Sequence, residues 1–150
     1  MSHARQQIRE AVVAAVTGLT TTGSNVYESR IFNLDPANTP ALNVVTTSEE
    51  VDEEMSSRSS SGFLLVRELG VEISAFVMAS SDSDDLVDTV CAEVEAAIAG
   101  NAALQALVQE ITLRSTEIEL LAEGERPIAK AAITFEAIYT TLENDAEVIV

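Results

Sequence analysis

The sequence is poor in the cysteines that form disulfides in small secreted domains and in the aromatic residues that stack on nucleic acid. Its 150 residues include one cysteine, three prolines, two tyrosines and no tryptophan. A single cysteine forms neither an internal disulfide nor a multi-thiolate metal site, and few aromatic rings leave little surface on which bases or sugars could stack. No run approaches the roughly 18 apolar residues of a membrane span, and the first residues lack the apolar stretch of a signal peptide. We therefore expect a soluble protein that is not exported and contacts no membrane.

Positive charge is also scarce. Eight Lys and Arg residues against 25 Asp and Glu residues give a net charge of −17 and a pI near 4.1. Such a field repels phosphate, which argues against a protein that wraps nucleic acid. Hydrophobic residues make up 47% of the chain, so the acid load does not indicate disorder. Length and composition predict one folded domain over residues 1–150 with an acidic surface.

Motifs of nucleotide, acyl-transfer and thiol chemistry are absent from the sequence. His3 is the only histidine and lies at the chain end, where packing is not expected to hold a general base or a zinc ligand. Cys91 falls on the apolar stripe of a predicted helix, where a thiol acts as a small hydrophobic group with a raised pKa. We predict no catalytic residue, no metal site and no enzymatic activity.

Apolar periodicity predicts an α+β fold. Three- and four-residue spacing predicts two helices, over residues 3–18 and 82–100. Alternating or continuous apolar residues predict five strands over 26–32, 41–47, 63–78, 111–121 and 129–141. The apolar phase changes within the fourth strand, which predicts a bulge near Ser115, and the turn at 124–127 joins the last two strands as a hairpin. This order predicts a mixed, mainly antiparallel sheet flanked by two helices.

Two segments show no apolar periodicity. Residues 48–62 have an acid-rich half followed by a serine-rich half, which predicts a long mobile loop. Its carboxylates are Glu49, Glu50, Asp52, Glu53 and Glu54. Their spacing lacks the pattern and the central glycine of a calcium loop, so we expect a solvated acidic loop. Residues 143–150 form a C-terminal tail that is either frayed or docked on a neighbour.

Several stretches resemble the tail terminator proteins of long-tailed bacteriophages, the family of the minor tail protein U. In the first half these are His3–Val12 (HARQQIREAV), Val26–Arg30 (VYESR) and Pro40–Val44 (PALNV). In the second half they are Thr116–Leu120 (TEIEL), the turn Gly124–Pro127 (GERP) and Ala132–Thr141 (AITFEAIYTT). The resemblance spans nearly the whole chain in order, although no single motif is diagnostic.

The resemblance implies a structural virion protein, made in the host cytoplasm, without an active site or cofactor. It implies a homo-oligomeric ring, hexameric in the family, that caps the completed tail tube, ends its polymerisation and forms the surface that joins the head. Its partners would be the tail tube protein and a head-completion or neck protein, at the head-proximal end of the tail. Genomic DNA would pass through the lumen without specific binding, and an acidic lumen suits that passage because it offers phosphates no attractive contact.

A ring of subunits that each carry a charge of −17 repels itself. Closure then requires basic residues opposite acids, screening of the charge, or a weakly held divalent cation at the subunit interface. The interface candidates are the loop acids Glu49, Glu50, Asp52, Glu53 and Glu54 together with Arg5, Arg9, Arg58, Arg67 and Arg114. The competing interpretation is that these arginines are surface partners of nearby acids in the same chain.

Three alternatives to a tail terminator stay open from the sequence. Another tail or neck completion protein would share the same small α/β design. A cation- or ligand-binding α+β module would bind its ligand as a monomer. A metal-dependent hydrolase would need carboxylate geometry and a cleft that the sequence does not reveal.

Overall fold

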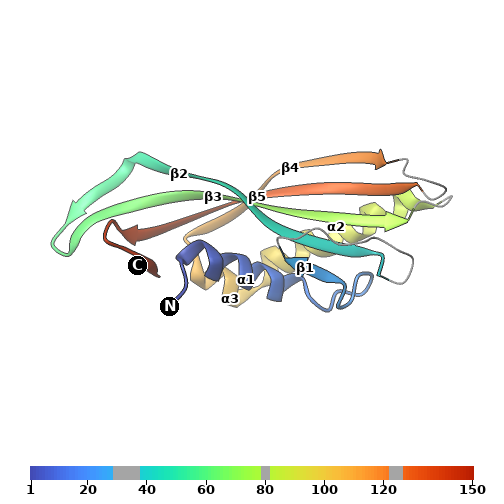
Figure 1. The fold of residues 1–150 in the computed structure, drawn as a ribbon, viewed down its shortest axis with the longest axis horizontal. Helices are drawn as coiled ribbons and strands as arrows, with labels where there is room; N and C mark the ends of the chain where they lie inside the picture. Colours follow the sequence, from blue (N-terminus) through green and yellow to red (C-terminus); the bar gives the residue numbers. More distant parts are fainter. Residues whose placement is uncertain (29–37, 79–81, 122–126) are drawn as a thin grey trace.

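The computed structural model describes residues 1–28, 38–78, 82–121 and 127–150, and its elements are arranged as an elongated sheet with helices on one face (Figure 1). The helices are α1 (Ala4–Val16), α2 (Ser83–Gly100) and α3 (Ala102–Leu107). The strands are β1 (Val26–Glu28), β2 (Ala41–Ser59), β3 (Gly62–Met78), β4 (Glu110–Leu121), β5 (Ile128–Leu142) and β6 (Asp145–Ile149). The expected α+β class is confirmed.

The sheet is mixed and mostly antiparallel. Its strand order is β1-β2-β3-β5-β4, and β6 pairs with β5 beyond the start of β4. The β1–β2 pair is parallel and the others are antiparallel. Strand β5 pairs with three other strands of the sheet. Strand β3 pairs along one side of it, while β4 and β6 share the other side.

The core lies between the helices and one face of the sheet. Alternate residues of β3 and β5 point into it, including Val71, Ile73, Ile133 and Phe135. Helix α1 buries Ala4, Ile8, Val12 and Val16 at a repeat of four residues, which is the spacing of one helical face. Burial of each such aliphatic side chain contributes about 1.5–3 kcal/mol to the stability of the fold. The apolar residues whose spacing predicts these elements are therefore also the residues that stabilise them.

The bulge predicted near Ser115 is confirmed. The register between β4 and β5 shifts between Leu113 and Ser115. Before the shift Leu113 lies opposite Phe135, and after it Ile118 lies opposite Ala131. Directly opposed residues share a face. The bulge therefore keeps the apolar residues of β4 on the helix-covered side of the sheet, although they change from odd-numbered to even-numbered positions.

The prediction of a loop at 48–62 is wrong. Strand β2 continues to Ser59 and forms a long hairpin with β3. Side chains complete the backbone pairing where the register shifts between Asp52 and Ser57: the Asp52 carboxylate accepts from the amides of Glu54 and Met55 at 3.1 Å, and Ser56 Oγ accepts from Val66 N at 3.0 Å. No residue from Glu49 to Ser59 is buried, so this part of β2 has no apolar alternation that periodicity could detect.

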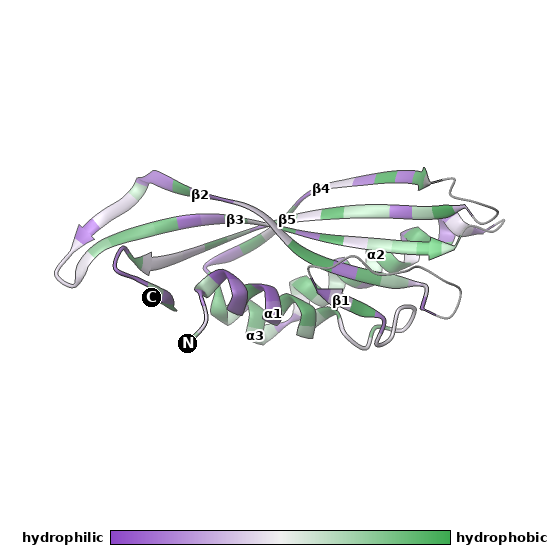
Figure 2. Cartoon of the chain, in the orientation of Figure 1, coloured by the Kyte–Doolittle hydropathy of each residue, from purple (hydrophilic) through white to green (hydrophobic). Residues whose placement is uncertain are grey.

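We call residues 49–59 with 62–68 the arm, and the helix-covered remainder of the sheet with its helices the body. Figure 1 shows the arm extending past the helices. None of the arm residues is buried, and white and purple predominate along its β2 strand in Figure 2.

Two further expectations differ from the structure. The sheet is flanked by three helices rather than two, because Asn101 both follows α2 and caps α3 by accepting from Leu104 N at 2.9 Å. Part of the C-terminal tail pairs with β5 of the same chain as strand β6, with Thr141 opposite Ile149.

The residues 29–32 of one predicted strand and 124–126 of the predicted turn lie outside the described residues.

Candidate functional site

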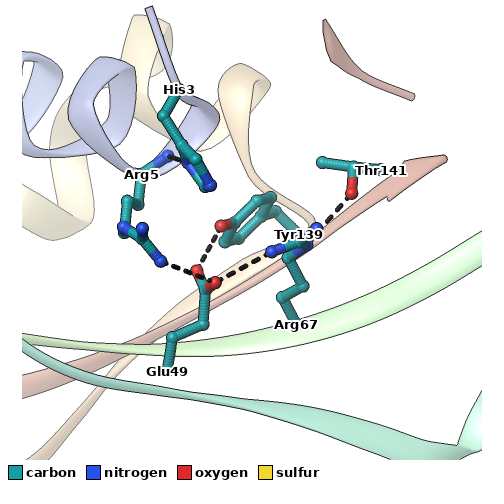
Figure 3. Close-up of polar contacts among 6 residues, drawn as sticks. All are labelled: His3, Arg5, Glu49, Arg67, Tyr139 and Thr141. Atoms are coloured by element: carbon teal, nitrogen blue, oxygen red, sulfur yellow. Dashed lines mark hydrogen bonds and ion pairs between the residues drawn. The ribbon is translucent and has the colours of Figure 1, made fainter. Parts of the chain in front are cut away.

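A polar cluster joins the arm to the body around the carboxylate of Glu49 (Figure 3). Glu49 Oε1 accepts from Arg67 at 3.0 Å and from Arg5 at 3.2 Å, and Tyr139 donates its hydroxyl to Oε2. Arg67 Nε also donates to Thr141 Oγ1 at 3.0 Å. The cluster therefore ties α1 to three neighbouring strands at the point where β2 leaves the body.

This cluster is largely shielded from water. The side chains of Glu49 and Arg67 are 10% and 12% exposed, whereas Arg5 is 45% exposed. Burial of the phenol, then its hydrogen bond to the Glu49 carboxylate, raises the pKa of Tyr139. Removing one partner from a buried pair leaves an uncompensated charge, so the cluster fixes how the arm leaves the body.

The remaining arginine candidates have partners in their own chain. Arg9 bonds Glu28 at 2.7 Å and Arg114 bonds Glu136 at 2.7 Å. Arg58 differs, because its guanidinium lies 5.6 Å from the ring centre of Phe63 near the tip of the arm and no described acid forms an ion pair with it. The structure thus brings Glu49, Arg5 and Arg67 together and leaves Arg9, Arg58 and Arg114 apart.

The other acids singled out in the sequence lie on the arm. Glu50, Glu53 and Glu54 are exposed, and Asp52 is half-buried because it caps the amides of the bulge. These four carboxylates remain interface candidates. Within the described part of the chain, no group of three or more His, Cys, Asp or Glu side chains is arranged to hold a metal ion.

The sheet face away from the helices, which we call the open face, is rich in carboxylates. Cross-strand register places acids on it from four strands: Glu50, Asp52, Glu68, Glu72, Glu110, Glu117, Glu119 and Glu136. Desolvation, then repulsion from Glu136, Asp52 and Glu50, raises the pKa of Glu68. Arg114 and Lys130 pair with Glu136 and Glu119 on this face, so it keeps an excess of negative charge that repels anions.

The edge strand β4 exposes large apolar side chains. Leu113, Ile118 and Leu120 are 41%, 58% and 66% exposed, and we call them the β4 stripe. Their opposite neighbours on β5 are buried, so the stripe continues the core past the point where helices cover it. Figure 2 shows the resulting alternation of green and purple along β4.

An apolar pocket lies along the outer half of the arm, near the chain's C-terminus. Its volume is about 580 Å³, and its apolar walls come from β2, β3, β5 and the terminal residue. The lining residues are Met55, Ser57, Ser59, Ser61, Leu64, Val66, Gln109, Thr140, Leu142 and Val150. None of them is ionised through its side chain, and we call this cavity the arm pocket.

The two residues considered for chemistry have structural roles. His3 Nδ1 accepts from Arg5 N at 3.1 Å and so caps α1, while desolvation, then the Arg5 charge, lowers its pKa. Cys91 is buried in α2, and burial, then Asp88 and Glu95, raises the pKa of its thiol. The predicted raised thiol pKa is confirmed, and a thiol that stays protonated is a poor nucleophile.

Sequence reasoning missed the role of Tyr139 and the exposure of the β4 stripe. Tyr139 belongs to the apolar alternation of β5, and only its hydroxyl signals a polar partner. Alternation in β4 correctly indicates one apolar face, but it does not reveal whether a helix covers that face. Only the position of β4 outside the helix layer decides this.

Comparisons with known proteins add little. No protein-family model and no curated protein matches the sequence. Among solved structures, a chain of the "Virion of native gene transfer agent (GTA) particle" matches with a TM-score of 0.34 and 16% identity, over 93% of this chain and 92% of that chain. A likeness with so low a TM-score carries no argument about this protein.

Among the described residues, no helix is both long enough and apolar enough to cross a membrane.

Proposed function

We propose that this protein is a structural virion subunit that assembles into a ring, as a tail terminator that caps the tail tube. The observation that carries the proposal is the edge strand β4, whose backbone edge no described strand pairs and whose apolar stripe is exposed. Charged residues such as Glu117 and Glu119 occupy one face of this edge strand, as is common for native edges, whereas an exposed apolar patch such as the one on its other face marks an interaction site. Assembly with further subunits would cover the β4 edge.

The open face gives the ring its second property. Its carboxylates repel phosphate, so a ring that turns this face inward would line a channel through which DNA slides without being held. The arm would then project from the body toward a neighbouring subunit, the tube protein or the neck protein. Its exposed residues Glu50, Glu53, Glu54 and Arg58 supply charged contacts for that role.

The proposal is tested by tube capping. Tail tube protein from the same genome is polymerised with and without this protein, and tube lengths and tube ends are examined by electron microscopy. We expect ring-shaped densities at tube ends and shorter tubes. Tubes of unchanged length without rings would contradict the proposal.

A matched variant makes the test specific to the arm. Because Asp52 lies opposite Val66, an Asn-Gly turn that replaces residues 53–65 joins two facing residues by a favoured hairpin loop. This arm-shortened variant keeps Glu49 and Arg67, so we expect it to fold and to lose capping.

A further inference from the structure

His3 accepts hydrogen bonds from three amides of the first turns of α1. Its ring atom Nδ1 accepts from Arg5 N at 3.1 Å, and its backbone carbonyl accepts from Gln6 N at 2.9 Å and from Gln7 N at 3.2 Å. The Arg5 amide is one of the amides at a helix start that no helical carbonyl can reach. The imidazole ring therefore supplies the partner that this amide would otherwise lack.

This cap requires a neutral ring. A neutral imidazole with its proton on Nε2 can accept at Nδ1, whereas an imidazolium donates from both nitrogens and accepts at neither. A positive charge is also unfavourable at a helix N-terminus, where the helix dipole is positive, and the first turn of α1 contains no acidic residue that would offset it. Protonation of His3 thus replaces a hydrogen bond with repulsion between two N–H groups.

The charged groups near the ring do not offer it a free acid. The titratable side chains that face it are Arg5 of α1, Glu49 of β2, Arg67 of β3, Tyr139 of β5 and Glu147 of β6 (Figure 3). The Glu49 carboxylate already binds both arginines, and Glu147 pairs with the amino group of Met1 at 3.7 Å. The raised pKa of Tyr139 keeps its hydroxyl neutral. An imidazolium would therefore lie beside two guanidinium groups, and both described acids that face it already have cationic partners.

The titration of the ring agrees with this geometry. Burial of the ring, then the charge of Arg5, lowers the pKa of His3 from its ordinary value of 6.5. The folded chain therefore binds this proton more weakly than the unfolded chain. Its contribution to stability is fully present above the unfolded pKa of 6.5 and is lost as pH falls through the folded pKa.

We propose that His3 is a proton-sensitive latch between the body and the arm: its neutral ring holds the first turn of α1, and with it Arg5 on Glu49, and protonation loosens this contact. The link is Arg5, which belongs to the capped turn and whose guanidinium reaches Glu49 Oε1 at 3.2 Å where β2 leaves the body. Arg67 and Tyr139 still hold Glu49 when Arg5 moves away. The latch does not depend on the proposed function, because it concerns how one chain holds its own arm.

Nuclear magnetic resonance of the whole chain tests the proposal. His3 is the only histidine, so its imidazole gives a single set of signals. The ring is titrated from about pH 8 to about pH 5 in the native and in the urea-unfolded protein, and the backbone amides of Arg5, Gln7 and Glu49 are followed in the native samples. The control variant His3→Asn keeps a side-chain acceptor at the cap position but is not protonated in this range.

We expect the ring to titrate at lower pH in the native protein than in the unfolded one. The Arg5 and Glu49 amide signals of the wild type should move with the same midpoint as the ring. Hydrogen exchange at the Gln7 amide, corrected for its intrinsic rate, should become about fivefold faster below that midpoint, which is the equilibrium factor of a typical helix N-cap. In His3→Asn these changes should be absent.

Two results would overturn the inference. A native ring that titrates at the same pH as the unfolded one, or higher, would show that Glu49 or Glu147 binds the imidazolium. A ring that titrates lower while the Arg5 and Glu49 amides stay fixed, or move equally in His3→Asn, would show that protonation of His3 does not reach the junction.

A second variant tests the charge balance around the ring. Glu147→Gln removes an acid that faces His3 and should move the titration of the ring to still lower pH. Glu143→Gln removes an exposed acid of the same C-terminal segment and is the matched control, which should leave the titration unchanged. Equal shifts in the two variants would contradict the assigned surroundings of the ring.

Discussion

The body and the arm follow different rules of stability. In the body, alternate strand residues such as Ile73 and Ile133 are fully buried under three helices. In the arm, the same two strands continue with no buried residue, and backbone pairing with β3 holds β2 in place. The body thus carries most of the folding free energy, while the arm is a hairpin extension most of whose side chains are available to a partner.

The largest expected effect contrasts the two regions directly. Ile73→Ala removes a fully buried side chain from the body and should lower the free energy of unfolding by about 2–5 kcal/mol. Val51→Ala in the arm, where the side chain is 44% exposed, should change it by less than about 0.5 kcal/mol. Urea unfolding of both variants measures the contrast, and equal losses would show that the arm belongs to the core.

The cluster at the junction comes next. Glu49→Gln leaves Arg67 without its carboxylate and should cost about 3 kcal/mol, because the pair is shielded from water. Glu50→Gln, next along the strand but exposed, is the control and should cost close to nothing. Thermal unfolding compares them. Equal stability of the two variants would show that the junction cluster does not hold the arm.

A smaller effect is expected where the two regions meet on β3. The bulge between Thr46 and Glu49 lies opposite Gly70, and a Cβ atom there would come within 2.5 Å of Thr47 Oγ1. Gly70→Ala should therefore cost about 1–3 kcal/mol through crowding. The double variant Gly70→Ala with Thr47→Ser should behave as Gly70→Ala, whereas Thr47→Gly should relieve most of the loss. No cost in the single variant would contradict this packing.

The smallest effect concerns the open face and depends on pH. The pKa of Glu68 is raised in the folded state, so the folded chain binds this proton more tightly than the unfolded chain. Its contribution to stability is present below the unfolded pKa near 4.5 and is lost as pH rises through the folded pKa. Glu68→Gln should therefore exceed the wild type in stability at pH 7, and the gain should shrink at pH 4 and in high salt. Urea midpoints under the three conditions measure it, and a gain that is independent of pH would contradict the electrostatic cause.

The sequence allowed the body to be predicted in some detail. Helix α1, the termination of α2 at Gly100, the apolar faces of β3 and β5 and the bulge near Ser115 all followed from periodicity, because each element buries one face. The β2 side of the arm was missed for the complementary reason. Residues 48–59 bury no apolar side chain, so the backbone hydrogen bonds that make them a strand leave no signal in the side-chain pattern.

The candidate site was only partly predictable. Arg5, Arg67 and Glu49 were singled out by charge alone, and their meeting depends on a cross-strand register and on the docking of α1 that spacing does not encode. The β4 stripe was visible as an apolar face, yet its exposure depends on where the helices end. Charge and periodicity therefore identify residues, whereas the three-dimensional order of strands decides which of them reach a partner.

The most direct test of self-assembly is the mass of the purified wild-type protein by light scattering, with and without millimolar Mg²⁺, across a salt series. A chain with uncovered apolar surfaces and a charge of −17 should assemble as salt or cation screens its repulsion. We expect a closed species of about six copies, the number that the resemblance to tail terminators implies. A monomer under every condition would contradict self-assembly through the β4 edge.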